Sequence, residues 1–202
     1  MKEFSLKGTE RTAGGKKAAK ILRTTGAIPC NLYGCNMKDA DGKAAAKSFS
    51  VKFEDVRKLI YTPEIFLVNL DIDGQTCKAV MKELQFHPVK DNVLHIDFYQ
   101  IAEEKPIVMA VPVVYTGHAI GVREGGAFRS LIRKLKVKAT YDKIPERLTI
   151  DITELGIGKS IIVGDLSFEG LEIVTPKQAL VCAVKATRNS KAAEEEAATE
   201  EA

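Results

Sequence analysis

The dipeptide Asp73-Gly74 constrains the fold of this chain more than any other short segment. Asp-Gly favours positive φ at both positions, as the tight two-residue turn of a β-hairpin requires. It is flanked by Phe66–Ile72 and Thr76–Leu84, two runs with the apolar content of strands. The pattern predicts two antiparallel strands joined at Asp73-Gly74.

A further strand is predicted over Val93–Ile101, where apolar and polar side chains alternate. Successive side chains of a strand point to opposite faces of the sheet. One face is therefore expected to hold Leu94, Ile96 and Phe98, and the other His95, Asp97 and Tyr99.

The rest of the first hundred residues suggests more strands and a short helix. The predicted strands lie around Phe4 and Leu6, over Ile28–Tyr33 and over Ser48–Phe53. A short helix is predicted over Phe53–Tyr61, and its inward side chains are expected to be Val56, Leu59 and Ile60. Residues 35–47 are polar and rich in Ala, Gly and Lys, which predicts a long loop.

Residues 15–25 predict a helix that ends at Gly26, a residue suited to a left-handed cap. At 100° per residue Lys16, Lys20 and Arg23 share one face of this helix. The opposite face, which is expected to pack, holds Ala18, Ile21, Leu22 and Thr25. The helix is therefore expected to present three cations away from its packed side.

The second half of the chain predicts an all-β domain. A cluster of charges before Pro106 suggests a boundary within Ala102–Pro106. The strands predicted beyond it are Ile107–Tyr115, Leu131–Tyr141, Leu148–Ile152, Ser160–Val163, Leu171–Val174 and Leu180–Lys185. The expected organisation is a domain over residues 1–101, a second over 102–188 and a disordered Ala/Glu-rich tail over 189–202.

Charge is distributed unevenly along the chain, although the whole carries a formal net charge of only +3. Residues 1–25 carry seven basic and two acidic residues, whereas residues 191–202 carry Lys191 and five glutamates. A basic N-terminal end suggests an anionic partner there.

The sequence holds no apolar run of the roughly 18–20 residues that a membrane span needs, and no secretion signal is expected. A reduced cytoplasmic protein is the expectation.

Motifs for catalysis or metal binding are incomplete. Gly158-Lys159-Ser160 resembles the end of a phosphate-binding P-loop, but Thr153 occupies the position of its first glycine, and the residues after Ser160 favour a strand. Cys30 and Cys35 have no second pair and no nearby His, so free buried thiols are expected instead of zinc. We expect no cofactor and no metal.

His87, His95 and Asp97 are the remaining cluster of catalytic residue types. A hydrolase built on them is one rival function, but no nucleophile can be paired with them from sequence. The alternative interpretation, without any binding or catalytic role, is that His95 and Asp97 form a satisfied polar pair on the solvent-exposed face of a strand. A cationic helix face and a polar strand face in one small domain instead favour binding of a phosphate backbone and a groove edge.

The order and spacing of several motifs resemble one family over residues 2–187. The first motif is Gly15-Lys16-x-Ala18-x-Lys20-x-Leu22-Arg23-x-x-Gly26-x-Ile28-Pro29-x-x-Leu32-Tyr33-Gly34. The next are Gln85-x-His87-Pro88 and Leu94-His95-Ile96-Asp97-Phe98. Together they resemble the bacterial large-subunit ribosomal protein family that binds 5S ribosomal RNA. Val113 to Leu166, with Gly121-Val122-x-Glu124-Gly125-Gly126, resembles the second domain of its two-domain branch, the general stress protein Ctc type.

The resemblance implies an N-terminal β-barrel with flanking helices that docks on the loop E region of 5S RNA, mainly through its minor groove. The binding positions that it implies here are Arg11, Lys16, Lys20, Arg23, Tyr33, Lys82, His95 and Asp97. Lys82 stands where some members have Gln, Ala19 where some have Ser, and Lys17 where Gly is common. For Tyr33, stacking or hydrogen bonding to RNA and packing on the barrel are equally favoured.

The sequence as a whole predicts an α+β, mainly β protein without catalytic activity, in which a barrel is followed by a second β domain. Its expected role is a structural constituent of the large ribosomal subunit that binds 5S rRNA, with the alternative of a stress-related RNA-binding or regulatory protein acting off the ribosome. Lys134, Lys136 and Lys138 alternate on one strand and would meet 23S rRNA or a neighbouring ribosomal protein, but a solvated face is the preferred interpretation.

Overall fold

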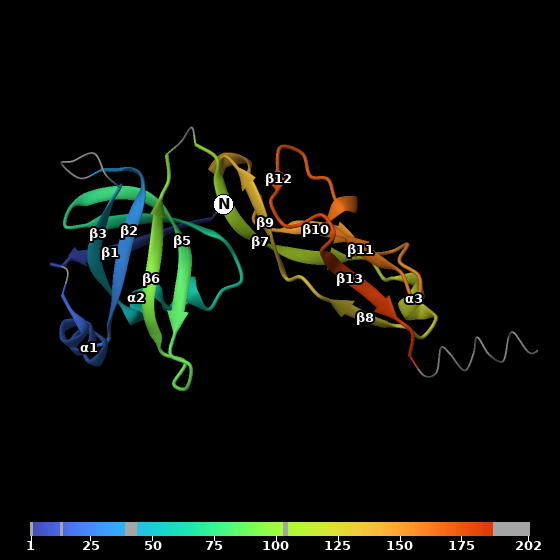
Figure 1. Ribbon diagram of the computed structural model, residues 1–202, viewed down its shortest axis with the longest axis horizontal. Helices are drawn as coiled ribbons and strands as arrows, with labels where there is room; N and C mark the ends of the chain where they lie inside the picture. The colour runs from blue at the N-terminus through green and yellow to red at the C-terminus, as the bar shows by residue number, and fades with distance from the viewer. Residues whose placement is uncertain (1, 13, 39–43, 103–104, 188–202) are drawn as a thin grey trace, which may run out of the picture. The chain divides into compact units, whose positions relative to one another are not determined.

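The chain forms two compact units in a computed structural model that describes residues 2–12, 14–38, 44–102 and 105–187 (Figure 1). The first unit comprises Met1–Ile107 with Thr140–Asp142, and the second comprises the rest of the chain. The expected acidic tail, residues 189–202, lies outside the described residues. Within the described residues, no helix combines the length and apolarity needed to span a membrane.

The first unit is a closed six-stranded barrel. Its strands follow one another in the order β1 (Lys2–Glu10), β3 (Ala44–Lys52), β2 (Ala27–Lys38), β6 (Val93–Gln100), β5 (Gln75–Phe86) and β4 (Phe66–Ile72). The pairs β1–β4 and β2–β6 are parallel, and the other four are antiparallel. Closure pairs both edges of the sheet, which leaves no long strand edge open to other chains.

The hairpin predicted at Asp73-Gly74 is confirmed. Asp73 has φ 49° and Gly74 φ 88°, and Ile72 pairs directly with Gln75. Two consecutive positive φ values are the mark of the turn that matches the twist of paired strands. β4 and β5 are thereby held in one register.

The predicted long loop over residues 35–47 is wrong at both of its ends. β2 continues to Lys38 and β3 begins at Ala44, with Lys38 opposite Ala44 after an irregularity in the pairing. Residues 39–43 lie outside the described part of the chain. Strand preference depends strongly on pairing context, so neighbouring strands draw a polar, Ala-rich segment into the sheet.

Pro29 lies inside β2, a strand with neighbours on both sides. It pairs with Ser50 of β3, whereas the parallel pairing with β6 begins one residue later, at Cys30 opposite Ile96. Proline has no backbone N–H to donate. Its position just before the parallel ladder begins explains how an interior strand accepts it.

The barrel interior is packed with apolar side chains from all six strands. Phe49 and Phe98 are fully buried, and their ring centroids lie 5.7 Å apart. Ile96 and Phe98 face inward, as the alternation over Val93–Ile101 predicts, while Leu94 is only half-buried. Fully buried aromatic and branched side chains supply most of the hydrophobic stabilisation of such a domain. The core thus fixes which side chains of β6 face outward.

The helix α1 (Lys16–Thr24) is present as predicted and ends before Gly26, which has φ 79°. Its expected packed face is wrong, because no residue of α1 is buried and Ile21 is 64% exposed. Ala19 and Leu22 are only half-buried. Lys, Ala, Leu and Arg are strong helix formers, so a helix forms here with little burial.

The second helix, α2 (Phe53–Ile60), buries Val56 and Leu59, which confirms their expected inward orientation. Ile60 is half-buried. Glu54 and Asp55 lie in the first turn of α2 and Arg57 and Lys58 in its last, an arrangement that complements the helix dipole. α2 therefore anchors firmly, in contrast to α1.

The second unit consists of two small sheets. The first has the order β10 (Leu148–Asp151), β7 (Ile107–Thr116), β9 (Lys134–Ala139) and β12 (Glu172–Ile173). The second has the order β11 (Ser160–Ile162), β13 (Leu180–Lys185) and β8 (Ala127–Ser130). A short helix, α3 (Ile120–Arg123), and β8 are not among the predicted elements. The mainly β fold with a barrel and a second β domain is confirmed.

The alternation predicted along β9 is confirmed. Leu135 and Val137 are fully buried, whereas Lys134 and Lys136 are exposed. Lys138 forms an ion pair with Glu172 of the neighbouring strand β12 at 3.0 Å. This cross-strand pair neutralises one of the three lysines that the sequence places on this face.

Candidate nucleic-acid interface

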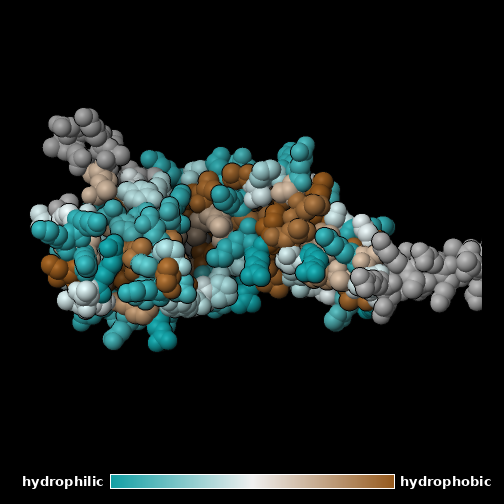
Figure 2. Space-filling model, turned by 60° about the horizontal axis from the view of Figure 1, so that its bottom comes forward, coloured by the Kyte–Doolittle hydropathy of each residue, from teal (hydrophilic) through white to brown (hydrophobic). Residues whose placement is uncertain are grey.

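Four polar side chains form one row across the outward face of the barrel. The strand pairing sets Glu83 beside Asp97, Asp97 beside Asn31, and Asn31 beside Ser48. Directly paired residues project from the same face of a sheet. We call these residues, which span β5, β6, β2 and β3, the polar row. The visible surface of this unit is mostly hydrophilic (Figure 2).

Within the polar row, Asp97 is paired with a histidine of its own strand. Nδ1 of His95 lies 3.1 Å from Oδ1 of Asp97, and about a fifth of each side chain is exposed. A carboxylate only accepts hydrogen bonds, so the imidazole is the group that can serve as donor in this contact. Within the described residues neither side chain has another polar partner, so Nε2 of His95 and Oδ2 of Asp97 remain for a ligand.

Asn31 is held from the opposite side of the row. The hydroxyl of Ser48 donates to Oδ1 of Asn31 at 3.1 Å. This bond fixes which end of the amide is occupied by protein and leaves its NH₂ group as a donor. The row therefore places an amide donor next to a carboxylate acceptor.

Tyr33 and Tyr99 lie two residues farther along the same strands and therefore on the same face as Asn31 and Asp97. They are directly paired, and their ring centroids are 5.9 Å apart with the rings nearly perpendicular. Burial raises the pKa of Tyr33, and the negative charges of Asp97 and Glu83 raise it further. Tyr33 therefore keeps its O–H and is a donor at neutral pH.

Lys82 reaches this pair of rings from a β-bulge. Met81 pairs with Phe98 and Glu83 with Asp97, so Lys82 is the extra residue between them. Its ammonium lies 5.3 Å from the centroid of Tyr99, a cation–π distance. Bulges often re-aim side chains, and this one turns a cation toward the two tyrosines.

Arg23 ties α1 to the strand that carries His95 and Asp97. Its Nε donates to the backbone carbonyl of Leu94 at 3.0 Å. Lys16 and Lys20 are exposed on the same helix, about two turns and one turn before Arg23, respectively. The sequence places the cationic helix face and the polar strand face in one small domain, and the bond of Arg23 brings the end of this helix against the strand.

Arg11 directly follows β1 and lies beside Ser48. Its backbone N–H donates to the carbonyl of Ser48 at 3.1 Å. Nε of Arg11 is buried and has no acceptor within the described residues. A buried donor without an acceptor costs stability.

Cys30 lies under this face as a buried thiol. Burial raises its pKa well above the usual range, and the charge of Arg11 only partly opposes that rise. A thiol that stays protonated is neither a nucleophile nor a metal ligand. Cys30 thus fits the expected free buried thiol, whereas the side chain of Cys35 lies outside the described ones.

The hydrolase built on His87, His95 and Asp97 finds no support in the geometry. Nδ1 of His87 accepts hydrogen bonds from the backbone N–H groups of Val89 and Lys90, both at 3.2 Å. In the described part of the chain, no three His, Cys, Asp or Glu residues are grouped to hold a metal ion. Ser160 begins a strand, where a P-loop would begin a helix.

Sequence reasoning missed Asn31, Ser48 and Glu83 in the polar row. Asn31 is two residues from Tyr33 in the same strand, so strand alternation alone places both on one face. Ser48 and Glu83 depend on strand pairing, and the bulge at Lys82 shifts the register that would place Glu83. No local pattern shows such a shift.

Comparisons with known proteins agree with this architecture. Residues 6–98 match the sequence model of the Ribosomal L25p family, and residues 106–188 match that of the Ribosomal protein TL5, C-terminal domain. A curated protein of Phocaeicola vulgatus, named large ribosomal subunit protein bL25, is 54% identical over 193 residues, which cover 96% of this chain and 97% of that protein. Proteins of the same name from Porphyromonas gingivalis and Bacteroides thetaiotaomicron are 53% and 50% identical over 96% of this chain and 97% of their own lengths.

These matches cover both units in the same order, and they confirm the resemblance that the sequence motifs indicate. The similarity of the curated relatives extends over nearly the whole length of each chain. The protein therefore belongs to the ribosomal L25p family.

Proposed function

We propose that this chain binds 5S ribosomal RNA through the outward face of β2 and β6 together with α1. The coarser role rests on the relatives, which are named proteins of the large ribosomal subunit. That family consists of structural ribosomal proteins, so the chain is a ribosome-associated cytoplasmic protein and not an enzyme. The choice of 5S RNA, at its loop E region, comes from the motif resemblance.

The bond between Arg23 and the carbonyl of Leu94 is the observation that carries the proposal. Phosphate contacts position a protein on nucleic acid, and contacts to base edges give specificity. Arg23 fixes a helix bearing Lys16 and Lys20 directly beside the strand that bears His95 and Asp97. Positioning groups on α1 and reading groups on β6 are therefore held next to each other.

The side chains of the polar row suit the minor groove of RNA. This groove is wide and shallow and displays 2′-hydroxyls and base edges, which short side chains on a strand can reach. Asp97 beside a phosphate backbone would be repelled unless it accepts from a donor, and guanine N2–H₂ and the 2′-hydroxyl are such donors. The contact with Nδ1 of His95 orients the carboxylate for that role.

The cations supply affinity that does not depend on sequence. Lys16, Lys20 and Arg23 are exposed on α1, and contacts from such groups to phosphates release counterions. Arg11 adds a further cation at the end of β1, where its backbone N–H bonds the carbonyl of Ser48. Lys82, held at Tyr99, adds a cation beside the tyrosine pair.

Binding of the full chain to 5S RNA and to a plain RNA duplex of equal length, across a salt series, tests the proposal. We expect tight binding to 5S RNA with a steep salt slope, and weak binding to the duplex. Equal, weak binding to both RNAs would refute it and favour a role off the ribosome. Co-sedimentation with large subunits in growing cells separates those two roles.

A further inference from the structure

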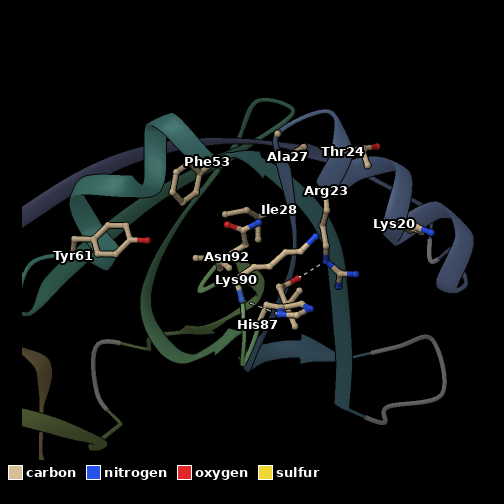
Figure 3. Close-up of a pocket in the computed structure, with 13 residues that line it drawn as sticks. Lys20, Arg23, Thr24, Ala27, Ile28, Phe53, Tyr61, His87, Lys90 and Asn92 are labelled. Carbon is tan, nitrogen blue, oxygen red and sulfur yellow. Dashed lines mark hydrogen bonds between the residues drawn. The ribbon is translucent and has the colours of Figure 1, made fainter.

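A groove of about 450 Å³ opens beside the proposed RNA-binding face. It lies where α1, the start and end of α2, and the connection between β5 and β6 come together (Figure 3). Its volume falls within the roughly 300–1,000 Å³ typical of small-ligand sites. Neither the sequence motifs nor the polar row account for this groove.

One side of the groove is cationic. Lys20, Arg23 and Lys90 line it, and no carboxylate is found among the described residues of its wall. Within the described residues, none of the three cations forms an ion pair. Nδ1 of His87 accepts from its own turn, so a neutral ring carries its proton on Nε2 as a further donor. This side suits a phosphate.

The other side of the groove is aromatic. Phe53 begins α2 and Tyr61 directly follows its last residue, and Figure 3 shows both rings on the side opposite Lys20 and Arg23. Tyr61 is 61% exposed, so most of its side chain is accessible to a ligand. Exposed rings are the surfaces on which unpaired RNA bases stack.

We propose that the groove takes one unstacked nucleotide of the bound ribosomal RNA. Its phosphate lies between Arg23 and Lys90, and its base stacks on Tyr61. This inference rests on the proposed RNA-binding function and extends it, because Arg23 borders both the polar strand face and the groove. The protein would thereby hold a nucleotide that lies outside the RNA minor groove, which Asp97 is proposed to read.

Titration of the ¹⁵N-labelled full chain with adenosine 5′-monophosphate tests the groove without any folded RNA. We expect amide shifts confined to residues 20–28, 53–61 and 87–94, and smaller shifts with adenosine or inorganic phosphate alone. Tyr61→Leu should remove the response to adenosine, whereas Tyr61→Phe should keep it. Shifts of equal size elsewhere, or none at the groove, would overturn the proposal.

Binding of the same variants to 5S RNA forms the second arm. Loss of one stacked base corresponds to an affinity loss of about five- to 150-fold, which we expect for Tyr61→Leu. Lys90→Ala should weaken binding, while Lys58→Ala, a change to an exposed lysine of α2 outside the groove, should not.

The two arms separate the two proposals. If the wild-type chain prefers 5S RNA and Tyr61→Leu binds it as tightly as Tyr61→Phe does, the groove proposal is wrong and the proposed function stands. If the chain shows no preference for 5S RNA but the nucleotide shifts the groove residues, the proposed function is wrong and the groove remains a nucleotide site.

Discussion

Nδ1 of His95 lies 3.1 Å from Oδ1 of Asp97, and both side chains face outward from the same strand of the barrel. The neighbouring residues Ile96 and Phe98 of the same strand point into the core and are fully buried. Buried neighbours on both sides restrict the backbone of β6, so the geometry of the pair is set before any ligand arrives.

Asp97→Ala should reduce the preference for 5S RNA over a plain duplex. A good base-edge contact is worth ~1–3 kcal/mol of discrimination, and Asp97 is the acceptor proposed to make it. Competition binding between the two RNAs measures the effect. Glu154→Ala, which removes an exposed carboxylate of the second unit, serves as the control. A preference unchanged in Asp97→Ala would contradict a reading role for this residue.

Lys20→Ala should weaken binding to 5S RNA and to the duplex alike. Lys20 is exposed on α1, and a phosphate contact adds affinity without sequence preference. The slope of log K against log salt should fall in magnitude by about one unit. The same salt series on Lys58→Ala gives the baseline. A loss confined to 5S RNA would assign Lys20 to sequence reading instead.

We expect the free energy of unfolding to fall at alkaline pH because Cys30 is buried. Burial raises the pKa of its folded-state thiol above the ordinary value of 9.0. The protonated thiol therefore stabilises the fold fully below pH 9, and this contribution declines as pH rises above that value. Each such group adds a slope of about 1.4 kcal/mol per pH unit to the free energy of unfolding.

Urea unfolding of wild type and Cys30→Ala between pH 8 and 11 checks this expectation. The wild-type curve should fall more steeply above pH 9 than that of the variant. Burial also raises the pKa values of Cys77 and Cys182, so some alkaline slope should remain in Cys30→Ala. Parallel curves would show that Cys30 ionises as easily in the folded chain as in the unfolded one.

Phe98→Ala should destabilise the first unit by about 3–5 kcal/mol. Phe98 is fully buried and packs on Phe49 in the barrel core. RNA binding should fall with it, since Asp97 and Tyr99 flank Phe98 on the same strand. Chemical unfolding measures the first effect and RNA titration the second. Retained stability would mean that the core is not organised around this ring.

Ile21→Gln should change the free energy of unfolding by less than about 0.5 kcal/mol. Ile21 is 64% exposed, whereas Leu59 on α2 is almost fully buried. Leu59→Ala is the contrasting variant and should cost about 2–5 kcal/mol. Unfolding curves of the two variants compare the helices directly. A large loss of unfolding free energy in Ile21→Gln would instead show that α1 packs through the face that its periodicity predicts.

The sequence carries enough local information for most elements of the fold. Asp73-Gly74 defines a hairpin because its turn type needs residues that tolerate positive φ. Alternation along Val93–Ile101 correctly separates Ile96 and Phe98 from His95 and Asp97, since the period of a strand is fixed.

Other features depend on contacts that no local pattern encodes. Residues 35–38 extend β2 as far as Lys38, which pairs with Ala44 of β3, although their composition favours a loop. The sequence of α1 is amphipathic, with Ile21 on its apolar face. Whether that face is covered depends on the position of the barrel. The polar row and the groove at Tyr61 likewise arise only from strand register and from the ends of three separate elements.

The parallel pairing of β2 with β6 has a consequence for how the protein is made. Asn31 meets Asp97 and Tyr33 meets Tyr99 only through this pairing, and each pair is separated by 66 positions along the chain. A nascent chain that has emerged only as far as β5 lacks β6, and with it His95, Asp97 and Tyr99 and one strand of the barrel. The proposed interface can therefore form only after synthesis has passed Gln100, about halfway along the 202-residue chain, so shorter nascent chains would lack it.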